Sequence, residues 1–439
     1  MERIAVIGAG ISGLTCAYEL QKTGQTVEVY EREARVGGRM ATRRYQGLAF
    51  DLGANFLVKA YPRLVSLSDE LGVELQNLSP VGHMLYRHGS FHRMNFDSPR
   101  DIIRMDYLKL WSRVKFAEFA LRLRHQYPHL DFFDLSTAPD ELNHSDAYDT
   151  ARRQIGPEFA DYILDAFHTC MMFYRSRETS AAAFLALFRM KSDPAYDFSI
   201  LHAPGEMQEL PDALAARLTV KADHGVVSLA HHEDGWLVTT ADSQEHYAKV
   251  VLATTAGVAR KLLRNGPDPH RDLLEKTRYA RTINLSYRVP AASFGNTHCF
   301  YIPYCENSVI AEFTNEAIKG RSNEGLALVN VGLHEEAAEK LWDRPDNQLF
   351  GLVAAELVKL HPGLSPEPHD LQRWPEAMPK FTCDQIDRVK RFLPHQGEQG
   401  LYLCGDYLNS PWLEGATRCG QRVAKLITSP GSGPRSDLP

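Results

Sequence analysis

The N-terminal segment combines a short apolar run with a stretch of helical spacing. Residues 3–8 are rich in branched apolar side chains, and residues 14–20 place apolar side chains on one helical face. A glycine-rich stretch over residues 8–13 lies between them. This order predicts a buried strand, a tight turn and a helix. A second strand is predicted over residues 26–30, so the chain opens with a β-α-β unit.

The rest of the chain alternates between helical and strand-like patterns. Helical spacing predicts helices over residues 106–127, 157–173, 179–190, 205–217 and 347–361. Apolar or alternating runs predict strands over residues 82–94, 225–229, 235–240, 247–253, 281–287, 299–313 and 326–332. Residues 400–427 predict a strand, a Gly-Asp turn, a loop and a helix, which repeats the arrangement at the N-terminus.

These changes of pattern predict an α/β fold in which a Rossmann-type nucleotide-binding domain is interrupted by a second domain. We expect the nucleotide-binding domain to comprise residues 1–60, 205–265 and 371–428. Residues 61–204 and 266–370 then form a discontinuous α+β substrate domain with a mixed sheet and a helical lobe. Residues 429–439 have the composition of a disordered tail.

The first turn carries the residue types that bind a dinucleotide. Gly8 allows the tight turn, Gly10 lets the backbone approach a pyrophosphate, and Gly13 permits close packing of helix on strand. Glu31 ends the second strand, where a carboxylate accepts hydrogen bonds from a ribose diol and repels a 2′-phosphate. This excludes NADP and leaves NAD and FAD open. The residues expected to contact the nucleotide are Gly8, Gly10, Ile11, Ser12, Gly13, Glu31 and Arg32.

Two further segments carry a resemblance to a known family. Glu31-Arg-Glu-Ala-Arg-Val-Gly-Gly-Arg-Met40 and Phe50-Asp-Leu-Gly-Ala-Asn-Phe56 resemble the second half of the FAD signature of the monoamine oxidase, protoporphyrinogen oxidase and phytoene desaturase superfamily. The resemblance implies FAD, with Arg39 supplying positive charge to the phosphates, although a surface arginine is the alternative. The residues it implies are Gly38, Arg39, Met40, Gly53, Ala54 and Asn55.

The C-terminal segment completes the resemblance. In the resembled family a Gly-Asp pair lies beside the ribityl and phosphate chain, and a Glu-Gly-Ala helix start directs its N–H groups at the flavin. A helix N-terminus at that place stabilises the negative charge of reduced flavin. The matching residues are Gly405, Asp406, Leu413, Glu414 and Ala416, with Val226 on the adenine side and Trp374 also beside the cofactor. An ordinary core valine is the alternative for Val226.

Departures from the family pattern limit the substrate assignment. Of the two tyrosines that flank the substrate in monoamine oxidases, one is matched by Trp412 and the other has no counterpart in residues 373–381. The lysine that holds water at flavin N5 is matched by Asn284. These departures favour the protoporphyrinogen oxidase and desaturase branch over a rapid oxidase. No cysteine stands at a flavin-linking position, which predicts non-covalent FAD.

The chemistry is expected to be centred on the flavin, because the cofactor takes the hydride and the protein orients the reactants. The sequence identifies no catalytic acid or base. Asn55, Asn284 and Trp412 are candidates near the flavin, and Phe56, Tyr174 and Trp412 are candidates for substrate contact. Core packing is the alternative for the run that ends at Tyr174.

Composition excludes several other functions. The formal net charge of -6 and the scattered basic residues exclude nucleic-acid binding. The seven cysteines form no Cys-x-x-Cys pair, which predicts free thiols in a reducing cytoplasm and no metal site. Met1 is followed within two residues by the first strand, which leaves no room for a signal peptide. No apolar run approaches the ~20 residues that span a bilayer.

Residues 107–124 combine a broad apolar face with five basic side chains. A core-packed helix with a solvated basic edge is the favoured interpretation, and peripheral membrane contact is the alternative. The sequence does not predict the oligomeric state.

The functional hypothesis is an FAD-dependent oxidoreductase that oxidises a C–N or C–C bond of a small, largely apolar organic substrate, with oxygen as electron acceptor. One alternative is a protoporphyrinogen-oxidase-like enzyme, or a desaturase or isomerase of a lipophilic polyene, that uses a quinone. The other is a non-catalytic nucleotide-binding scaffold.

Overall fold

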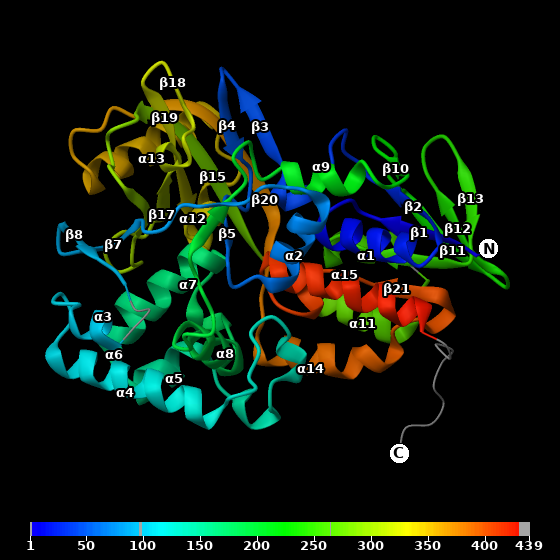
Figure 1. The fold of residues 1–439 in the computed structure, drawn as a ribbon, viewed down its shortest axis with the longest axis horizontal. Helices are drawn as coiled ribbons and strands as arrows, with labels where there is room; N and C mark the ends of the chain where they lie inside the picture. Colours follow the sequence, from blue (N-terminus) through cyan, green and yellow to red (C-terminus); the bar gives the residue numbers. More distant parts are fainter. Residues whose placement is uncertain (1, 96–98, 264, 430–439) are drawn as a thin grey trace.

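The computed structural model describes residues 2–95, 99–263 and 265–429, and the predicted tail lies outside them except for Ser429. Figure 1 shows three regions: a parallel sheet with its helices on the right, a mixed sheet at the upper left, and a helical lobe at the lower left. Both chain ends contribute to the first region, as the sequence predicts. The mixed α/β architecture is confirmed.

The parallel sheet is the core of the nucleotide-binding domain. Its strand order is β10-β2-β1-β14-β21, with all neighbours parallel. The residues of β1 from Ile4 to Ile7 are at most 3% exposed, because a parallel sheet is normally covered on both faces. The strands are β1 (Arg3–Ile7), β2 (Thr26–Tyr30), β10 (Val220–Lys221), β14 (Lys249–Leu252) and β21 (Leu401–Leu403).

Helices from the two chain ends pack together beside this sheet (Figure 1). They are α1 (Ile11–Lys22) and α15 (Leu413–Thr428). A Cβ on Gly420 would lie 2.5 Å from the Ser12 carbonyl oxygen, so the close approach requires glycine there. This contact places the C-terminal segment against the phosphate-binding turn. The other helices around the domain are α2 (Pro62–Leu71), α9 (Glu209–Ala215), α10 (Ala256–Leu262), α11 (Asp268–Lys276) and α14 (Cys383–Phe392).

A small antiparallel sheet, β11 (Ser228–His232), β12 (Gly235–Thr239) and β13 (Gln244–Tyr247), is joined to the parallel sheet by a charge network. Glu245 accepts hydrogen bonds from Lys221 at 2.6 Å and from Arg3 at 2.6 Å. Glu28 accepts from Arg3 at 2.6 Å. The Lys221 ammonium and the Arg3 guanidinium lower the pKa of Glu245 to about 2.

We expect Glu245→Gln to remove a pH-dependent part of the stability. Because the folded pKa of Glu245 lies below its ordinary value, its contribution is present above about pH 4.5 and is lost as the pH falls toward 2. The difference in unfolding free energy between wild type and variant should therefore shrink over that range, as measured by urea titration. Glu233→Gln, at an exposed position between β11 and β12 of the same small sheet, is the control. A difference that is constant with pH would contradict the prediction.

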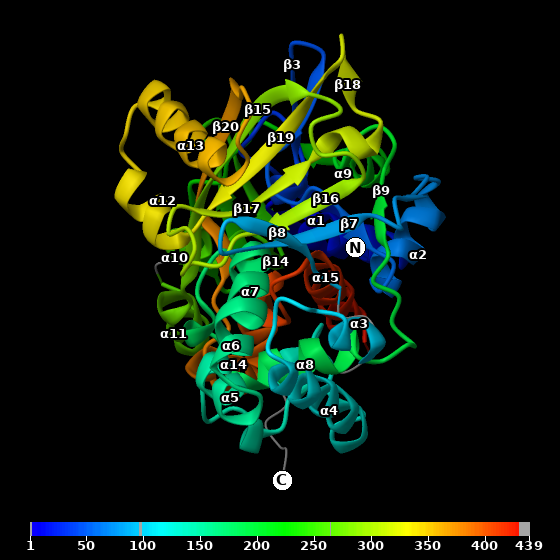
Figure 2. The same cartoon turned by 90° about the vertical axis from the view of Figure 1, so that its left-hand side faces the viewer.

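The mixed sheet forms the second core. Its order is β20-β15-β19-β17-β16-β7-β8, and β18 pairs with β19. Helices α12 (Glu335–Leu341) and α13 (Asp346–Leu360) pack on it (Figure 2). The strands are β7 (Gly82–Arg87), β8 (Ser90–Arg93), β15 (Tyr279–Pro290), β16 (Thr297–Tyr301), β17 (Ile310–Asn315), β18 (Ser322–Asn323), β19 (Leu326–Leu333) and β20 (Glu367–Pro379).

Two sequence expectations change in this sheet. The predicted domain boundary at residue 371 falls inside β20, which pairs along its length with β15. Residues 371–379 therefore belong to the mixed sheet. The predicted single strand over residues 299–313 is two antiparallel strands, β16 and β17.

Short strands form two further small sheets outside the two large ones. They are β3 (Thr42–Tyr45), β4 (Leu48–Asp51), β5 (Leu57–Val58), β6 (Gln76–Asn77) and β9 (Ile200–His202).

The helical lobe has an aromatic core. Phe116, Phe119, Phe159, Phe184 and Phe188 contact one another, with ring centroids 4.5 to 6.5 Å apart. The predicted helix over residues 157–173 is interrupted by a π-helical turn over Ala160–Leu164. The helices are α3 (Pro99–Ile103), α4 (Leu110–Gln126), α5 (Ala147–Gln154), α6 (Pro157–Phe159), α7 (Asp165–Met172) and α8 (Ala181–Lys191). Within the described ranges, no helix is both long and apolar enough to cross a bilayer.

Candidate cofactor and substrate site

A cavity of about 1500 Å³ lies between the parallel and mixed sheets. Pockets for drug-sized ligands are typically about 300–1,000 Å³, so this one has room for a nucleotide cofactor together with a substrate. Twenty of the residues predicted from the sequence line it: Gly8, Gly10, Ile11, Ser12, Glu31, Arg32, Gly38, Arg39, Met40, Gly53, Ala54, Asn55, Phe56, Val226, Asn284, Trp374, Asp406, Trp412, Leu413 and Ala416. The structure thus gathers segments that lie hundreds of residues apart.

The first turn has the shape of a phosphate cradle. Gly8 has φ +107°, a conformation that favours glycine. A Cβ on Gly10 would meet no described atom within 4 Å, and Gly10 borders the cavity. A side chain there would occupy the space through which a pyrophosphate reaches the backbone. The turn therefore fits a dinucleotide.

Gly13 serves the packing of helix on strand and does not border the cavity. A Cβ at this position would lie 2.1 Å from the Gly8 carbonyl oxygen and 2.9 Å from the Ala253 Cβ. The prediction that Gly13 permits close packing of the helix on the strand is confirmed. Gly13 lies within α1 and does not border the cavity, so the geometry does not support its predicted contact with the nucleotide.

We expect Gly13→Ala to destabilise the protein and to loosen the cradle. Overpacking of this kind costs about 1–3 kcal/mol, and backbone atoms cannot rotate away as a side chain would. The loss should appear in the free energy of unfolding and in the retention of bound flavin. Gly351→Ala is the matched control, because Gly351 lies exposed in α13 with no described atom within 4 Å of its Cβ position. That change should be neutral or stabilising by up to about 1 kcal/mol. Equal effects at the two positions would contradict the packing argument.

Glu31 shapes the turn and also faces the cavity. Its Oε2 accepts a hydrogen bond from the Ala9 N–H at 2.9 Å, and its Oε1 accepts one from the Glu33 N–H at 3.0 Å. A carboxylate has about four lone-pair positions, so capacity for a diol is left. Arg32 also borders the cavity, but its side chain is 73% exposed and forms an ion pair with Glu33.

The charge of Arg39 is already paired within the protein. The guanidinium forms an ion pair with Asp406 at 2.8 Å and donates to the Ala377 carbonyl oxygen at 2.8 Å. The alternative of a free surface arginine is therefore wrong. This ion pair joins the N-terminal and C-terminal halves of the site, and it neutralises a carboxylate that would otherwise repel phosphate.

Residues 51–55 are held at the cavity by bonds from the mixed sheet. The Leu52 carbonyl oxygen accepts from Asn284 Nδ2 at 3.0 Å and from Trp374 Nε1 at 2.7 Å. Asn55 Nδ2 donates to Thr314 Oγ1 at 3.1 Å. The amide of Asn284 thus has a structural bond, while its Oδ1 is buried without a partner among the described residues.

A buried ionic cluster lies behind this segment. Lys319 pairs with Glu316 at 2.6 Å and with Asp51 at 3.5 Å, and Arg321 pairs with Asp51 at 2.6 Å. The side chains of Lys319, Glu316 and Asp51 are fully buried. Lys319 Nζ also donates to the Asn55 carbonyl oxygen. The cluster fixes the backbone that borders the cavity.

The start of α15 borders the cavity through Leu413 and Ala416. The side chain of Glu414 turns away: its carboxylate accepts from the N–H groups of Arg63 and Leu64, at 3.2 and 3.0 Å, and so caps α2. Its predicted cofactor contact is therefore corrected for the side chain. Gly405 also does not border the cavity.

Aromatic side chains border the part of the cavity where the sequence predicts contact with a substrate. Trp412 packs against Phe132 and Tyr61, with ring centroids 4.7 and 6.1 Å apart. Phe56 also borders the cavity. Tyr174 does not, because it is buried with its hydroxyl accepting from the Phe381 N–H at 3.2 Å. The prediction that Tyr174 contacts substrate is corrected.

The sequence reasoning missed a polar wall formed by β17, β19 and neighbouring elements. Glu312, Thr314 and Asn330 border the cavity, and neither Asn330 side-chain atom nor Oε2 of Glu312 has a partner within the described part of the chain. Burial, with a smaller effect of Glu316, raises the pKa of Glu312 to about 8. The available signal was Glu312 and Thr314 at alternate positions of an apolar strand, which places both on one face.

Comparisons with known proteins agree with this geometry. Residues 11–428 match the family described as flavin containing amine oxidoreductase. Protoporphyrinogen oxidase 2 of Arabidopsis thaliana is 23% identical over 499 residues, covering 98% of this chain and 94% of the relative. Flavin-containing amine oxidase B of Homo sapiens is 36% identical over 471 residues, covering 97% and 85%. The solved structure of cyclohexylamine oxidase from Brevibacterium oxydans IH-35A is similar in fold, with a TM-score of 0.77, 15% identity and coverage of 97% and 98%.

Proposed function

The chain belongs to the flavin-containing amine oxidoreductase family, and from this premise we propose that it is an FAD-dependent enzyme that dehydrogenates a C–N or C–C bond of a small, largely apolar organic molecule. Family membership makes it a flavin-dependent oxidoreductase. FAD as the flavin, its non-covalent attachment and the class of substrate are our proposals.

The continuity of the cavity carries the proposal. One space is bordered by the glycine turn and Glu31 at the nucleotide end and by Trp412, Phe56 and the polar wall at the other end. A dinucleotide held at the first end would leave the second end for its reactive ring and the substrate. This arrangement supports a reaction between the cofactor and an enclosed substrate.

The chain's own residues orient and enclose the reactants. Bound flavin accepts a hydride or its equivalent from the substrate. The start of α15 borders the cavity through Leu413 and Ala416, and the positive end of its helix dipole favours negative charge there. Trp412 and Phe56 exclude water beside the apolar part of the substrate. The Glu312 carboxyl, with its pKa near 8, holds a proton at neutral pH and presents a hydrogen-bond donor to a polar substrate group.

Anaerobic reduction of the flavin tests the function. Purified protein is mixed without oxygen with a panel of amines, amino acids, porphyrinogens and polyenes, and the oxidised flavin absorbance is followed. We expect bleaching by members of one class only. Reduction by amines supports C–N oxidation, whereas reduction by porphyrinogens or polyenes supports C–C oxidation. If no member of the panel bleaches a flavin that dithionite does reduce, the catalytic proposal is overturned in favour of a nucleotide-binding scaffold.

The electron acceptor is a separate part of the proposal. We propose oxygen, with a quinone as the alternative. Readmission of oxygen to the reduced protein should restore the flavin absorbance and release hydrogen peroxide. Reoxidation by a soluble quinone but not by oxygen would overturn the oxygen assignment.

Denaturation should release the flavin into the supernatant, and flavin that stays on the precipitated protein would contradict non-covalent binding.

One surface supports contact with a membrane. Leu110 and Trp111 of α4 are 63% and 68% exposed, and Val114 and Leu121 are also exposed, next to Lys115 over the Trp111 ring at 5.4 Å. The other face of α4 packs in the helical lobe through Phe116 and Phe119. We therefore propose peripheral contact with anionic lipid, because apolar and basic groups together suit that surface. The wild-type protein should sediment with anionic vesicles, and the Trp111→Ser variant should not. Equal sedimentation of variant and wild type would contradict the proposed membrane contact.

A further inference from the structure

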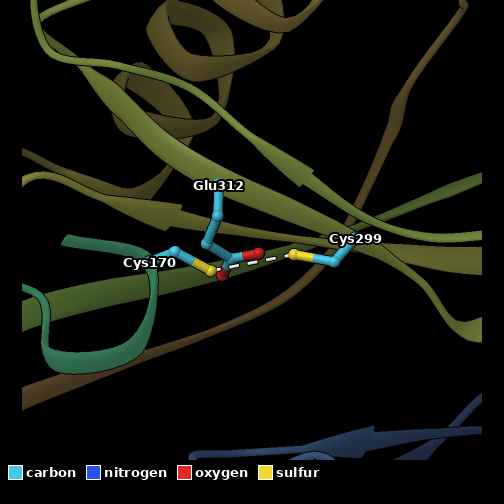
Figure 3. A group of neighbouring side chains, drawn as sticks. All are labelled: Cys170, Cys299 and Glu312. Carbon is cyan, nitrogen blue, oxygen red and sulfur yellow. Dashed lines mark hydrogen bonds between the residues drawn. The ribbon is translucent and has the colours of Figure 1, made fainter. Parts of the chain in front are cut away.

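The side chains of two cysteines and a glutamate lie close together (Figure 3), and all three residues border the cavity. Cys299 lies in β16 and Glu312 in the adjacent antiparallel strand β17, and Cys170 lies in α7, a helix far from both in the sequence. The two sulfur atoms are 3.7 Å apart, and one donor atom of each of the three residues lies within 4.8 Å of the others. Within the described ranges, this is the one such group of three.

The spacing of the sulfurs is that of a tetrahedral thiolate pair. With zinc–sulfur bonds of about 2.3 Å, tetrahedral geometry separates two thiolates by about 3.8 Å. The two thiols lie 3.7 Å apart and share a hydrogen bond, and this separation matches that of two sulfurs on one tetrahedral metal ion. A carboxylate oxygen is an accepted third ligand of zinc, and Oε2 of Glu312 has no other partner among the described residues.

The group also has an open side. All three residues border the large cavity, so a fourth coordination position would face that space. Structural zinc sites are closed by four protein ligands, whereas an open fourth position admits water or a small molecule. This distinguishes the group from two cysteines that merely pack in a core.

We propose that Cys170, Cys299 and Glu312 bind a thiophilic divalent cation of the zinc class at the cavity wall. Binding exchanges the two thiol protons and the carboxyl proton for the metal, and these protons pass to solvent; no electron is transferred. The site is distinct from the nucleotide end of the cavity. If the proposed function holds, an occupied site places a cation in the substrate space and lowers turnover.

Cobalt binding tests the site independently of turnover. The flavin-containing protein, reduced with a phosphine and freed of metals, is titrated with Co²⁺ under argon. We expect one Co²⁺ per chain and the ligand-field absorption of a tetrahedral thiolate centre, at wavelengths longer than the flavin absorbs. Zn²⁺ should displace the Co²⁺ and abolish that absorption. A spectrum of octahedral Co²⁺ without thiolate bands would overturn the proposal.

Variants assign the ligands. Cys170→Ser, Cys299→Ser and Glu312→Gln should each weaken Co²⁺ binding by more than about 100-fold, because even changes outside the ligand set cost up to about that factor. Cys305→Ser, at an exposed cysteine, is the matched control and should bind as wild type does. Flavin content shows that each variant is folded. Folded cysteine variants with unchanged tetrahedral spectra would overturn the assignment, whatever the outcome of the substrate panel.

Discussion

Replacement of Lys319 by methionine is expected to lower the free energy of unfolding by about 3–5 kcal/mol. The ammonium group is fully buried between Glu316 and Asp51, at 2.6 and 3.5 Å. Its removal leaves two buried carboxylates facing one guanidinium, Arg321, and a buried charge without its partner is costly. The measurement is a urea titration with flavin at saturation.

The same change should also weaken flavin retention. Lys319 donates to the Asn55 carbonyl oxygen, and Asn55 borders the cavity, so loss of the bond frees the backbone of residues 51–55. Lys359→Met is the control, because Lys359 is 68% exposed and pairs with its helical neighbour Glu356. Exposed pairs contribute about 0–1 kcal/mol. If the Lys319 variant lost no more stability than this control, the buried ionic cluster would not be what fixes the backbone of residues 51–55.

Replacement of Glu31 by alanine is expected to weaken binding of the proposed FAD by at least about 100-fold. Two charge-assisted hydrogen bonds to a ribose diol are worth roughly 1.5–3 kcal/mol each. The variant also loses the acceptor for the Ala9 and Glu33 N–H groups, which shapes the turn. The dissociation constant is measured by quenching of flavin fluorescence as apoprotein is added.

Two controls separate the roles of the Glu31 carboxylate. Glu31→Gln keeps an acceptor oxygen without the charge, so its loss of affinity should be intermediate. Glu74→Ala removes an exposed carboxylate outside the cavity and should leave the affinity unchanged. If Glu31→Ala bound flavin as tightly as wild type, Glu31 would have no ribose contact and would serve only the turn.

Local sequence was sufficient where the physical constraint is local. The strand, turn and helix at the N-terminus were predictable because Gly8 must adopt a positive φ and Gly13 must approach the Gly8 carbonyl oxygen. The strands around it were predictable because parallel strands are buried on both faces. The order of the later motifs indicated one cofactor site, and the structure brings most of their residues to one cavity.

Sequence reasoning failed where the partner of a side chain lies on a distant element. Nothing near Glu414 in the sequence indicates that its carboxylate caps α2, more than 300 residues away in the chain. The assignment of residues 371–379 failed for a related reason, because a strand joins whichever sheet edge the folded chain presents to it. Tyr174 was misplaced because a run of apolar and aromatic residues does not show which of them faces a cavity.

The sequence by itself therefore determined the nucleotide-binding turn, since it depends on backbone conformation and close contacts over short separations, and the flavin followed from the order of motifs that resembles a known family. Only the tertiary structure showed which residues form the polar wall of the cavity. Cys170 meets Cys299 and Glu312 of the paired strands β16 and β17 through the packing of α7 against them, and no spacing along the chain encodes that contact. Strand register and helix packing set which side chains share a cavity, and these are properties of the whole fold.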